Sequence, residues 1–166
     1  MANSGSENSS DKMPITVFGK AQIESELKRL MQEERPSVIR AIEEARSHGD
    51  ISENAEYESA KERQAVVEGR IQEVQGKLAG AEVIDTSKIV SDRIVFGAAV
   101  TIMDRDTDEE STYQIVGVDE ADVKQGFISI LSPLARALIG KKNGDEVLVK
   151  SPKGDKEYEV VSFSFK

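Results

Sequence analysis

Two acidic residues, Asp50 and Glu53, have the spacing of a small metal-binding pair. Residues three positions apart lie on one face of a helix, so their carboxylates can point in the same direction. Carboxylate oxygens suit Mg²⁺, which proteins usually hold with one or two carboxylates together with phosphate oxygens and water. The pair is therefore half of a magnesium site. The same spacing is typical of a helix capping box, with Asp50 as the cap and Glu53 in the first turn, and spacing alone favours that interpretation.

Two amphipathic helices flank the pair and predict a helical hairpin. Apolar residues recur at helical intervals before it, apart from a kink or short break expected at Pro36, which removes a helix hydrogen bond. They are Ile23, Leu27, Leu30, Ile39, Ile42 and Ala45. After the pair, steps of three and four residues form a heptad seam. Its members are Tyr57, Ala60, Val67, Ile71, Val74 and Leu78.

The polar turn between these helices, residues 47–54, becomes the tip of a rod. Two long helices joined by a short turn pack antiparallel, and about 27 residues per arm give a length of about 40 Å. A rod this thin encloses no substrate pocket, but it reaches far from the rest of the chain. Carboxylates at its tip are therefore expected to act as ligands that the chain lends to the active site of a partner.

The C-terminal part of the sequence changes to short β-type runs and predicts a small antiparallel sheet with one helix. The runs cover residues 98–103, 112–118, 127–131, 146–150 and 158–165. Between the third and the fourth, Ser132 suits a helix N-cap, Pro133 the first helical position and Gly140 the stop. Lys153 and Gly154 indicate a hairpin turn between the last two strands. The fold class expected for the whole chain is α+β.

Composition excludes several classes of function. The chain has 22 basic and 31 acidic residues, a net charge of −9, so it is not expected to hold naked nucleic acid tightly on its own. It has no cysteine and only one histidine, His48, which excludes thiolate and histidine-rich metal sites. No apolar run approaches the length of about 18 residues that spans a membrane. Residues 1–14 lack a secretory signal and are expected to be a disordered extension, which fits a cytoplasmic protein.

Other residues near the turn have open interpretations. Arg46 and Lys61 lie on the two arms and could guide a phosphate backbone, or could simply be solvated helix residues. His48 is interpreted as a turn residue and Tyr57 as part of the seam. Asn54 is either a helix-start residue or a polar contact.

Several segments together resemble the GreA/GreB family of bacterial transcription elongation factors. They are AIEEARSHGDISENAEY at 41–57, EGRI at 68–71, VID at 83–85 and ISILSPLARALIGK at 128–141. The resemblance runs from about residue 16 to residue 165. It implies a coiled-coil domain at 15–84 and an FKBP-like domain at 85–166 that docks on RNA polymerase. The coiled coil would enter the secondary channel and stimulate the polymerase's own cleavage of backtracked RNA, so the chain itself would not be an enzyme.

The resemblance also implies roles for individual residues. Asp50 and Glu53 match the family's acidic pair, thought to position the second Mg²⁺ of the polymerase active site, and no metal is expected on the isolated chain. Arg46 and Lys61 match positions thought to contact the 3′ segment of the nascent RNA. The loop of Ser132, Pro133 and Leu134 matches a part of the C-terminal domain that faces polymerase.

One departure from the family pattern lies between the two carboxylates. Residues 51 and 52 are Ile and Ser, where the family often has Leu and Lys, so one positive charge is missing from the tip. This change could weaken contact with phosphate, but it leaves the two expected metal ligands in place.

The chain is expected to act as a monomer.

Three alternative functions differ in what they require. An inhibitory channel-binding protein of the same fold would differ at the tip, and the Asp-x-x-Glu pair followed by Asn-Ala-Glu-Tyr favours cleavage stimulation instead. A prolyl isomerase needs aromatic residues around proline, and aromatic residues make up only 5% of this chain. A coiled-coil adaptor without chemistry is all that composition alone supports.

Overall fold

The computed structural model describes residues 12–49 and 54–166 and divides into two compact units. One unit is the helical hairpin, Lys20–Gly80; the other combines the residues up to Gly19 with Ala81–Lys166. The α+β class expected from the sequence is confirmed. No helix within the described residues is long and apolar enough to cross a membrane.

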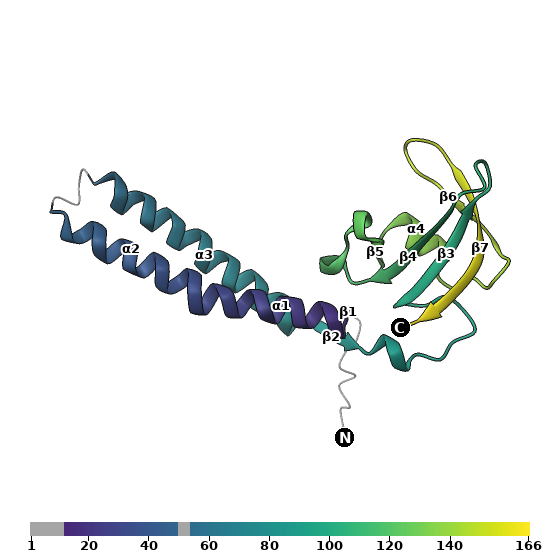
Figure 1. The fold of residues 1–166 in the computed structure, drawn as a ribbon, viewed down its shortest axis with the longest axis horizontal. Helices are drawn as coiled ribbons and strands as arrows, with labels where there is room; N and C mark the ends of the chain where they lie inside the picture. The colour runs from purple at the N-terminus through teal and green to yellow at the C-terminus, as the bar shows by residue number, and fades with distance from the viewer. Residues whose placement is uncertain (1–11, 50–53) are drawn as a thin grey trace, which may run out of the picture. The chain divides into compact units, whose positions relative to one another are not determined.

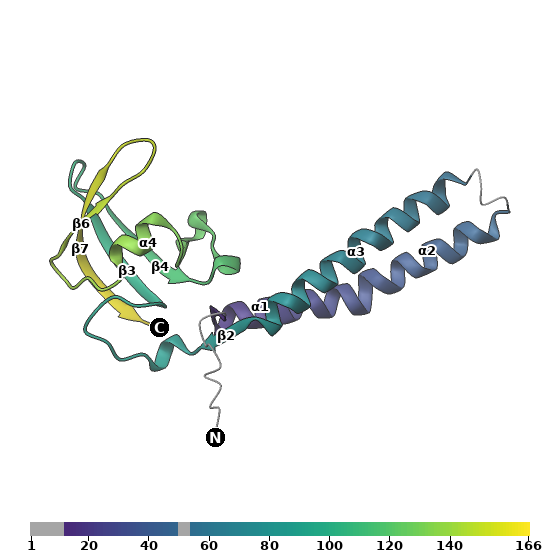
Figure 2. The ribbon, with the colours of Figure 1, turned by 180° about the vertical axis from the view of Figure 1, so that it is seen from behind.

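The hairpin has two helical arms that lie side by side in both views of the ribbon (Figure 1 and Figure 2). One arm consists of α1 (Val17–Arg29), the π-helical turn η2 (Leu30–Glu34) and α2 (Arg35–Ser47), and the other is α3 (Ala55–Ala79). Apolar side chains of the arms meet in two clusters along the predicted seam. The first has Leu30, Ile71 and Val74 at its centre, and the second has Val38, Ile42 and Ala60.

The predicted interruption at Pro36 takes the form of the π-helical turn just before it. The backbone N–H of Arg35 bonds to the carbonyl of Leu30, five residues earlier. Such a turn is wider than an α-helical one, so it rotates the residues that follow about the helix axis. This explains one wrong prediction: Val38 is 1% exposed and occupies the seam, whereas Ile39 is 42% exposed.

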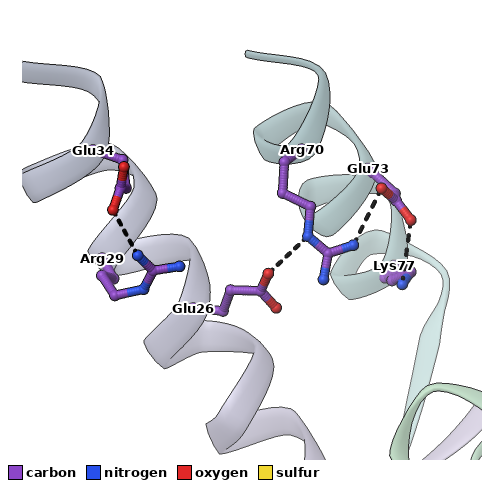
Figure 3. Close-up of polar contacts among 6 residues, drawn as sticks. All are labelled: Glu26, Arg29, Glu34, Arg70, Glu73 and Lys77. Atoms are coloured by element: carbon purple, nitrogen blue, oxygen red, sulfur yellow. Dashed lines mark hydrogen bonds and ion pairs between the residues drawn. The ribbon is translucent and has the colours of Figure 1, made fainter. Parts of the chain in front are cut away.

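Ion pairs join the arms outside the apolar seam. Figure 3 shows Arg70 of α3 donating to Glu26 of α1 at 2.7 Å and lying 3.2 Å from Glu73 of its own helix. Closer to the tip, Arg35 donates from Nε and Nη2 to the two carboxylate oxygens of Glu68, at 2.7 and 2.8 Å. This bidentate geometry is the strongest form of such a pair. The hydrogen bond from Arg35 holds the pKa of Glu68 below its usual 4.5.

The second unit contains a five-stranded sheet in the order β5-β4-β3-β7-β6. Its strands are β3 (Ala98–Asp104), β4 (Glu110–Val116), β5 (Phe127–Ser129), β6 (Glu146–Val149) and β7 (Lys156–Phe165). Three pairings are antiparallel as expected, but β4 and β5 pair in parallel. The chain between those two strands makes short 3₁₀ turns, η5 (Val118–Glu120) and η6 (Val123–Gln125), and so returns to run in the same direction.

The short helix α4 (Pro133–Leu138) forms with the caps read from the sequence. The Ser132 hydroxyl accepts from the backbone N–H of Ala135, Pro133 is in the first turn, and Gly140 has a φ of +85°, the left-handed conformation that favours glycine after a helix. Ala135 and Leu138 are fully buried and join the apolar core of the sheet. The helix therefore covers part of that core.

A feature absent from the prediction is a two-stranded parallel sheet that ties the N-terminal segment to the C-terminal unit. Strand β1 (Met13–Thr16) pairs with β2 (Ala81–Ile84). Residues 13 and 14, expected in the extension, belong to β1. By its internal contacts, the second unit includes residues from Ala81 onward and also takes in the first turn of α1.

The Glu120 carboxylate fixes this N-terminal segment. It accepts from the backbone N–H of Thr16 at 3.1 Å, from the Thr16 hydroxyl, and from the backbone N–H of Gly117 at 2.8 Å. A side chain at Gly19 would collide with Glu120, and one at Gly117 would come within 2.5 Å of the Pro14 carbonyl. Close approach to the backbone therefore requires Gly117, whereas a side chain at Gly19 would displace the Glu120 carboxylate.

Candidate functional site at the end of the hairpin

The described helix ends bracket the predicted acidic tip. Helix α2 ends at Ser47, and Gly49 follows with a φ of +107°. Helix α3 begins at Ala55 with Asn54 as its N-cap. Asp50 and Glu53 lie outside the described residues, so their proposed role as metal ligands stays a prediction.

Asn54 is the residue that joins the two helix ends. Its Oδ1 accepts from the backbone N–H of Tyr57 at 3.2 Å, the usual bond of an N-cap. Its Nδ2 donates to the backbone carbonyl of Ala45, in the last turn of α2, at 2.6 Å. Asn54 is thus both a helix-start residue and a polar contact, the two interpretations that the sequence left open. The N-cap of α3 is Asn54; the capping interpretation of Asp50 and Glu53 concerns residues outside the described part of the chain.

Arg46 and Lys61 lie on the same side of the hairpin. Arg46 is about three helical turns from Arg35, and Lys61 is about two turns from Glu68. Because Arg35 and Glu68 pair across the seam, residues at these intervals share that side. The Arg46 guanidinium also lies over the ring of Tyr57, 5.7 Å from its centroid. The two cations therefore approach one face from different arms.

Tyr57 has the seam position expected of it. It is half-buried and packs against the cluster of Val38, Ile42 and Ala60. Its contact with Arg46 is a cation–π interaction, which contributes about 0.5–1 kcal/mol at an exposed site. That contact holds the Arg46 side chain close to the hairpin instead of leaving it free in solvent.

A groove near the hairpin end is lined mainly by small residues. It is lined by Ala41, Glu44, Ala45, Ala55, Glu56, Ser59, Ala60 and Arg63. Short side chains allow the helices to approach closely, but they provide little interlocking surface at this end. The hydrogen bond from Asn54 to Ala45 therefore adds to the packing of Tyr57 and Ile42 in holding the helix ends together.

Within residues 12–49 and 54–166, no cluster of three or more acidic or histidine side chains forms a metal cage. His48 is the C-cap residue of α2, and its backbone N–H bonds to the carbonyl of Ala45 at 3.3 Å. This agrees with its interpretation as a turn residue.

The C-terminal residues expected to face a partner have distinct positions. Ser132 uses its hydroxyl as the cap of α4, Pro133 is exposed, and Leu134 is half-buried against the core. Leu131, just before them, is 50% exposed. Pro133 is thus the most available of the three predicted residues, and sequence reasoning did not single out Leu131 beside it.

A helical hairpin and a second, α+β unit that contains the β1–β2 pair define the class of protein. Comparison with known proteins agrees along nearly the whole chain. The family model described as "Transcription elongation factor, N-terminal" matches residues 13–83, and that described as "Transcription elongation factor, GreA/GreB, C-term" matches residues 89–165. The chain belongs to the GreA/GreB family of transcription elongation factors.

Individual relatives match over almost their full length. A protein of Hyphomonas neptunium named transcription elongation factor GreA is 58% identical over 156 residues, which cover 94% of this chain and 99% of the relative. A Beijerinckia indica protein of the same name is 58% identical over 155 residues, covering 93% and 99%. Among solved structures, the GreA factor homolog Gfh1 of Thermus thermophilus is 26% identical, with a TM-score of 0.42 and coverage of 92% and 99%.

Proposed function

We propose that this elongation factor enters the secondary channel of bacterial RNA polymerase and stimulates the polymerase's own endonucleolytic cleavage of backtracked nascent RNA. Cleavage would leave a new RNA 3′ end from which elongation resumes. The observation that carries the proposal is the hairpin end: two packed helices stop on either side of the segment that contains Asp50 and Glu53. Membership of the GreA/GreB family supports it.

The chemical role proposed for the tip is to bring Asp50 and Glu53 to a magnesium ion in the polymerase active site. Proteins usually give one or two carboxylates to Mg²⁺, with phosphate oxygens and water completing the shell. In a two-metal site, the ions generate the attacking hydroxide and stabilise the leaving oxygen. This chain's contribution is to orient two ligands, while polymerase and RNA provide the rest. We expect no tight Mg²⁺ binding by the isolated chain.

Arg46 and Lys61 are proposed to contact phosphates of the RNA 3′ segment. They project on one side of the hairpin from opposite arms, and Tyr57 holds the guanidinium of Arg46. Two cations placed this way can engage successive phosphates while the tip approaches the metal. Because the whole chain has a net charge of −9, such local contacts would act only after the protein has bound polymerase.

The C-terminal unit is proposed to hold the factor on polymerase. The proposed contact is the exposed Pro133 at the start of α4, with Ser132 and Leu134 on either side. The Ser132 cap fixes the backbone of this loop. Binding and chemistry would then belong to separate units, so each can be altered without loss of the other.

Backtracked elongation complexes incubated with the factor and Mg²⁺ test the proposal. The wild type should release short 3′ RNA fragments, whereas Asp50→Ala and Glu53→Ala should abolish release and still bind polymerase. Binding without cleavage by the wild type would instead indicate the inhibitory function of the same fold. Hydrolysis of free RNA without polymerase would show that the chain is itself a nuclease and contradict the proposal.

A further inference from the structure

The Asn54 side chain bridges the two arms with two hydrogen bonds, one made by its oxygen and the other by its nitrogen. A substitution can therefore remove one bond and keep the other. The carbonyl oxygen of the side chain caps α3 through Tyr57, and the amide nitrogen bonds to Ala45 of α2. Only the first bond is needed to start a helix. The second joins the first residue of one arm to the last turn of the other.

The surroundings make this second bond important for the end of the hairpin. The groove beside it is lined by the short side chains of Ala41, Ala45, Ala55 and Ala60, which offer few atoms for interlocking contact. The nearest large buried side chains of α2, Ile42 and Val38, lie about one and two turns before Ala45, so apolar packing stops short of the last turn. A direct hydrogen bond across the arms therefore limits how far the ends of α2 and α3 can move apart.

We propose that Asn54 is a positioning residue for the acidic pair. Asp50 and Glu53 are attached to the hairpin through Gly49 on one side and Asn54 on the other, so the Asn54 bridge sets the distance that their segment must span. Holding the two ends in place restricts the positions open to the carboxylates before they meet a metal. The inference rests on the proposed function, and it assigns Asn54 an effect that acts through the two carboxylates.

Substitution can remove the bridge and keep the cap. Ser and Asp cap helices about as well as Asn. An ionised Asp has no hydrogen to donate to the Ala45 carbonyl, and the Ser hydroxyl has a shorter reach than the Asn amide. Asn54→Ser keeps residue 54 uncharged, and Asn54→Asp controls for side-chain length. Asn54→Ala removes both bonds and shows the cost of losing the cap as well.

The first readout needs no polymerase. The chain has no cysteine, so Cys introduced at Ser47 and Glu58, both exposed, can carry a pair of spin labels across the hairpin end. The wild type should give a narrow distance distribution, and Asn54→Ser and Asn54→Asp should each broaden it. Both variants should retain the helix content and the thermal midpoint of the wild type, because the cap remains.

The second readout is transcript cleavage by saturating factor. Asn54→Ser should reduce the cleavage rate about tenfold, within the range expected for a catalytic group displaced by less than about 1 Å. The Mg²⁺ concentration for half-maximal rate should rise and high Mg²⁺ should restore part of the loss, while the factor concentration for half-maximal cleavage stays unchanged. A purely structural role would move the thermal midpoint or the factor concentration instead.

The outcomes separate this inference from the proposed function. Wild-type distance distributions, or wild-type cleavage at every Mg²⁺ concentration, in both Asn54→Ser and Asn54→Asp would overturn the positioning role even if Asp50→Ala abolishes cleavage. If Asp50→Ala and Glu53→Ala both cleave normally, the proposed function fails, and the spin-label result still decides whether Asn54 holds the helix ends.

Discussion

Removal of the Glu120 carboxylate should loosen the N-terminal segment of the second unit. Both backbone donors, Thr16 and Gly117, bond to the same oxygen, Oε2, while the Thr16 hydroxyl bonds to Oε1. A hydrogen bond to a charged acceptor contributes about 1.5–3 kcal/mol. Glu120 is half-buried, so in the variant water can replace part of the lost hydrogen bonding, and the lower value applies. Two backbone bonds at about 1.5 kcal/mol predict a loss of about 3 kcal/mol for Glu120→Ala.

Glu120→Gln is the matched control. An amide oxygen in the place of Oε2 would still accept from Thr16 and Gly117, and the amide nitrogen could donate to the Thr16 hydroxyl. The loss should then be about 1 kcal/mol, the difference between charged and neutral hydrogen bonds.

Amide hydrogen exchange measured residue by residue is the suitable assay, because it reports local opening in a chain that has two units. The amide of Gly117 should exchange about a hundredfold faster in Glu120→Ala, which follows from about 3 kcal/mol at 1.36 kcal/mol per factor of ten. In Glu120→Gln the increase should be about fivefold. Equal exchange in wild type and Glu120→Ala would refute the account of this contact.

Three further predictions concern packing, pH and charge. Gly117→Ala should destabilise the second unit by about 1–3 kcal/mol in chemical denaturation, because its Cβ would lie 2.5 Å from the backbone oxygen of Pro14; an unchanged midpoint would contradict the close approach. Arg35 lowers the pKa of Glu68, so the pair stabilises the hairpin above pH 4.5 and the contribution is lost as pH falls below it. The difference in thermal midpoint between wild type and Glu68→Gln should therefore shrink between pH 6 and pH 3, the range that spans this loss, and a constant difference would rule out the ion pair as its cause. Lys61→Ala should weaken cleavage about fivefold at low salt, which corresponds to about 1 kcal/mol for an exposed phosphate contact, and the effect should fade at about 0.5 M salt; a salt-independent defect would argue against a phosphate contact.

Local signals predicted the second unit well. Ser132, Pro133 and Gly140 each have a residue type that suits one position of a helix end, and the structure uses all three in that way. These effects depend on neighbours in the sequence, so sequence suffices to find them. The turn at Gly154, with a φ of +121°, is of the same kind.

The long-range strand pairings were not predicted from the sequence. Strand β1 is only four residues long, contains Pro14, and pairs with a strand more than sixty residues away. The parallel partner of β4 depends on the path of the turns after Gly117. Neither pairing leaves a periodic pattern in the local sequence.

The hairpin end combined both kinds of signal. The helical period predicted the seam, but the π-helical turn rotates the helix so that Val38, and not Ile39, lies in it. Asn54 could be recognised as a possible helix start, but its bond to Ala45 depends on the other arm. The assignment of Asp50 and Glu53 to metal binding still rests on their chemistry and on the family.

The rate of transcript cleavage at saturating factor tests the central claim most directly. Backtracked complexes should be mixed with wild type, Asp50→Asn or Glu53→Gln, which change charge but hardly change shape. Each variant should lower the saturated rate at least a hundredfold, equivalent to about 3 kcal/mol of lost metal stabilisation, with an unchanged factor concentration at half-maximal rate. Saturated rates equal to the wild type in both variants would contradict a catalytic role for the acidic pair.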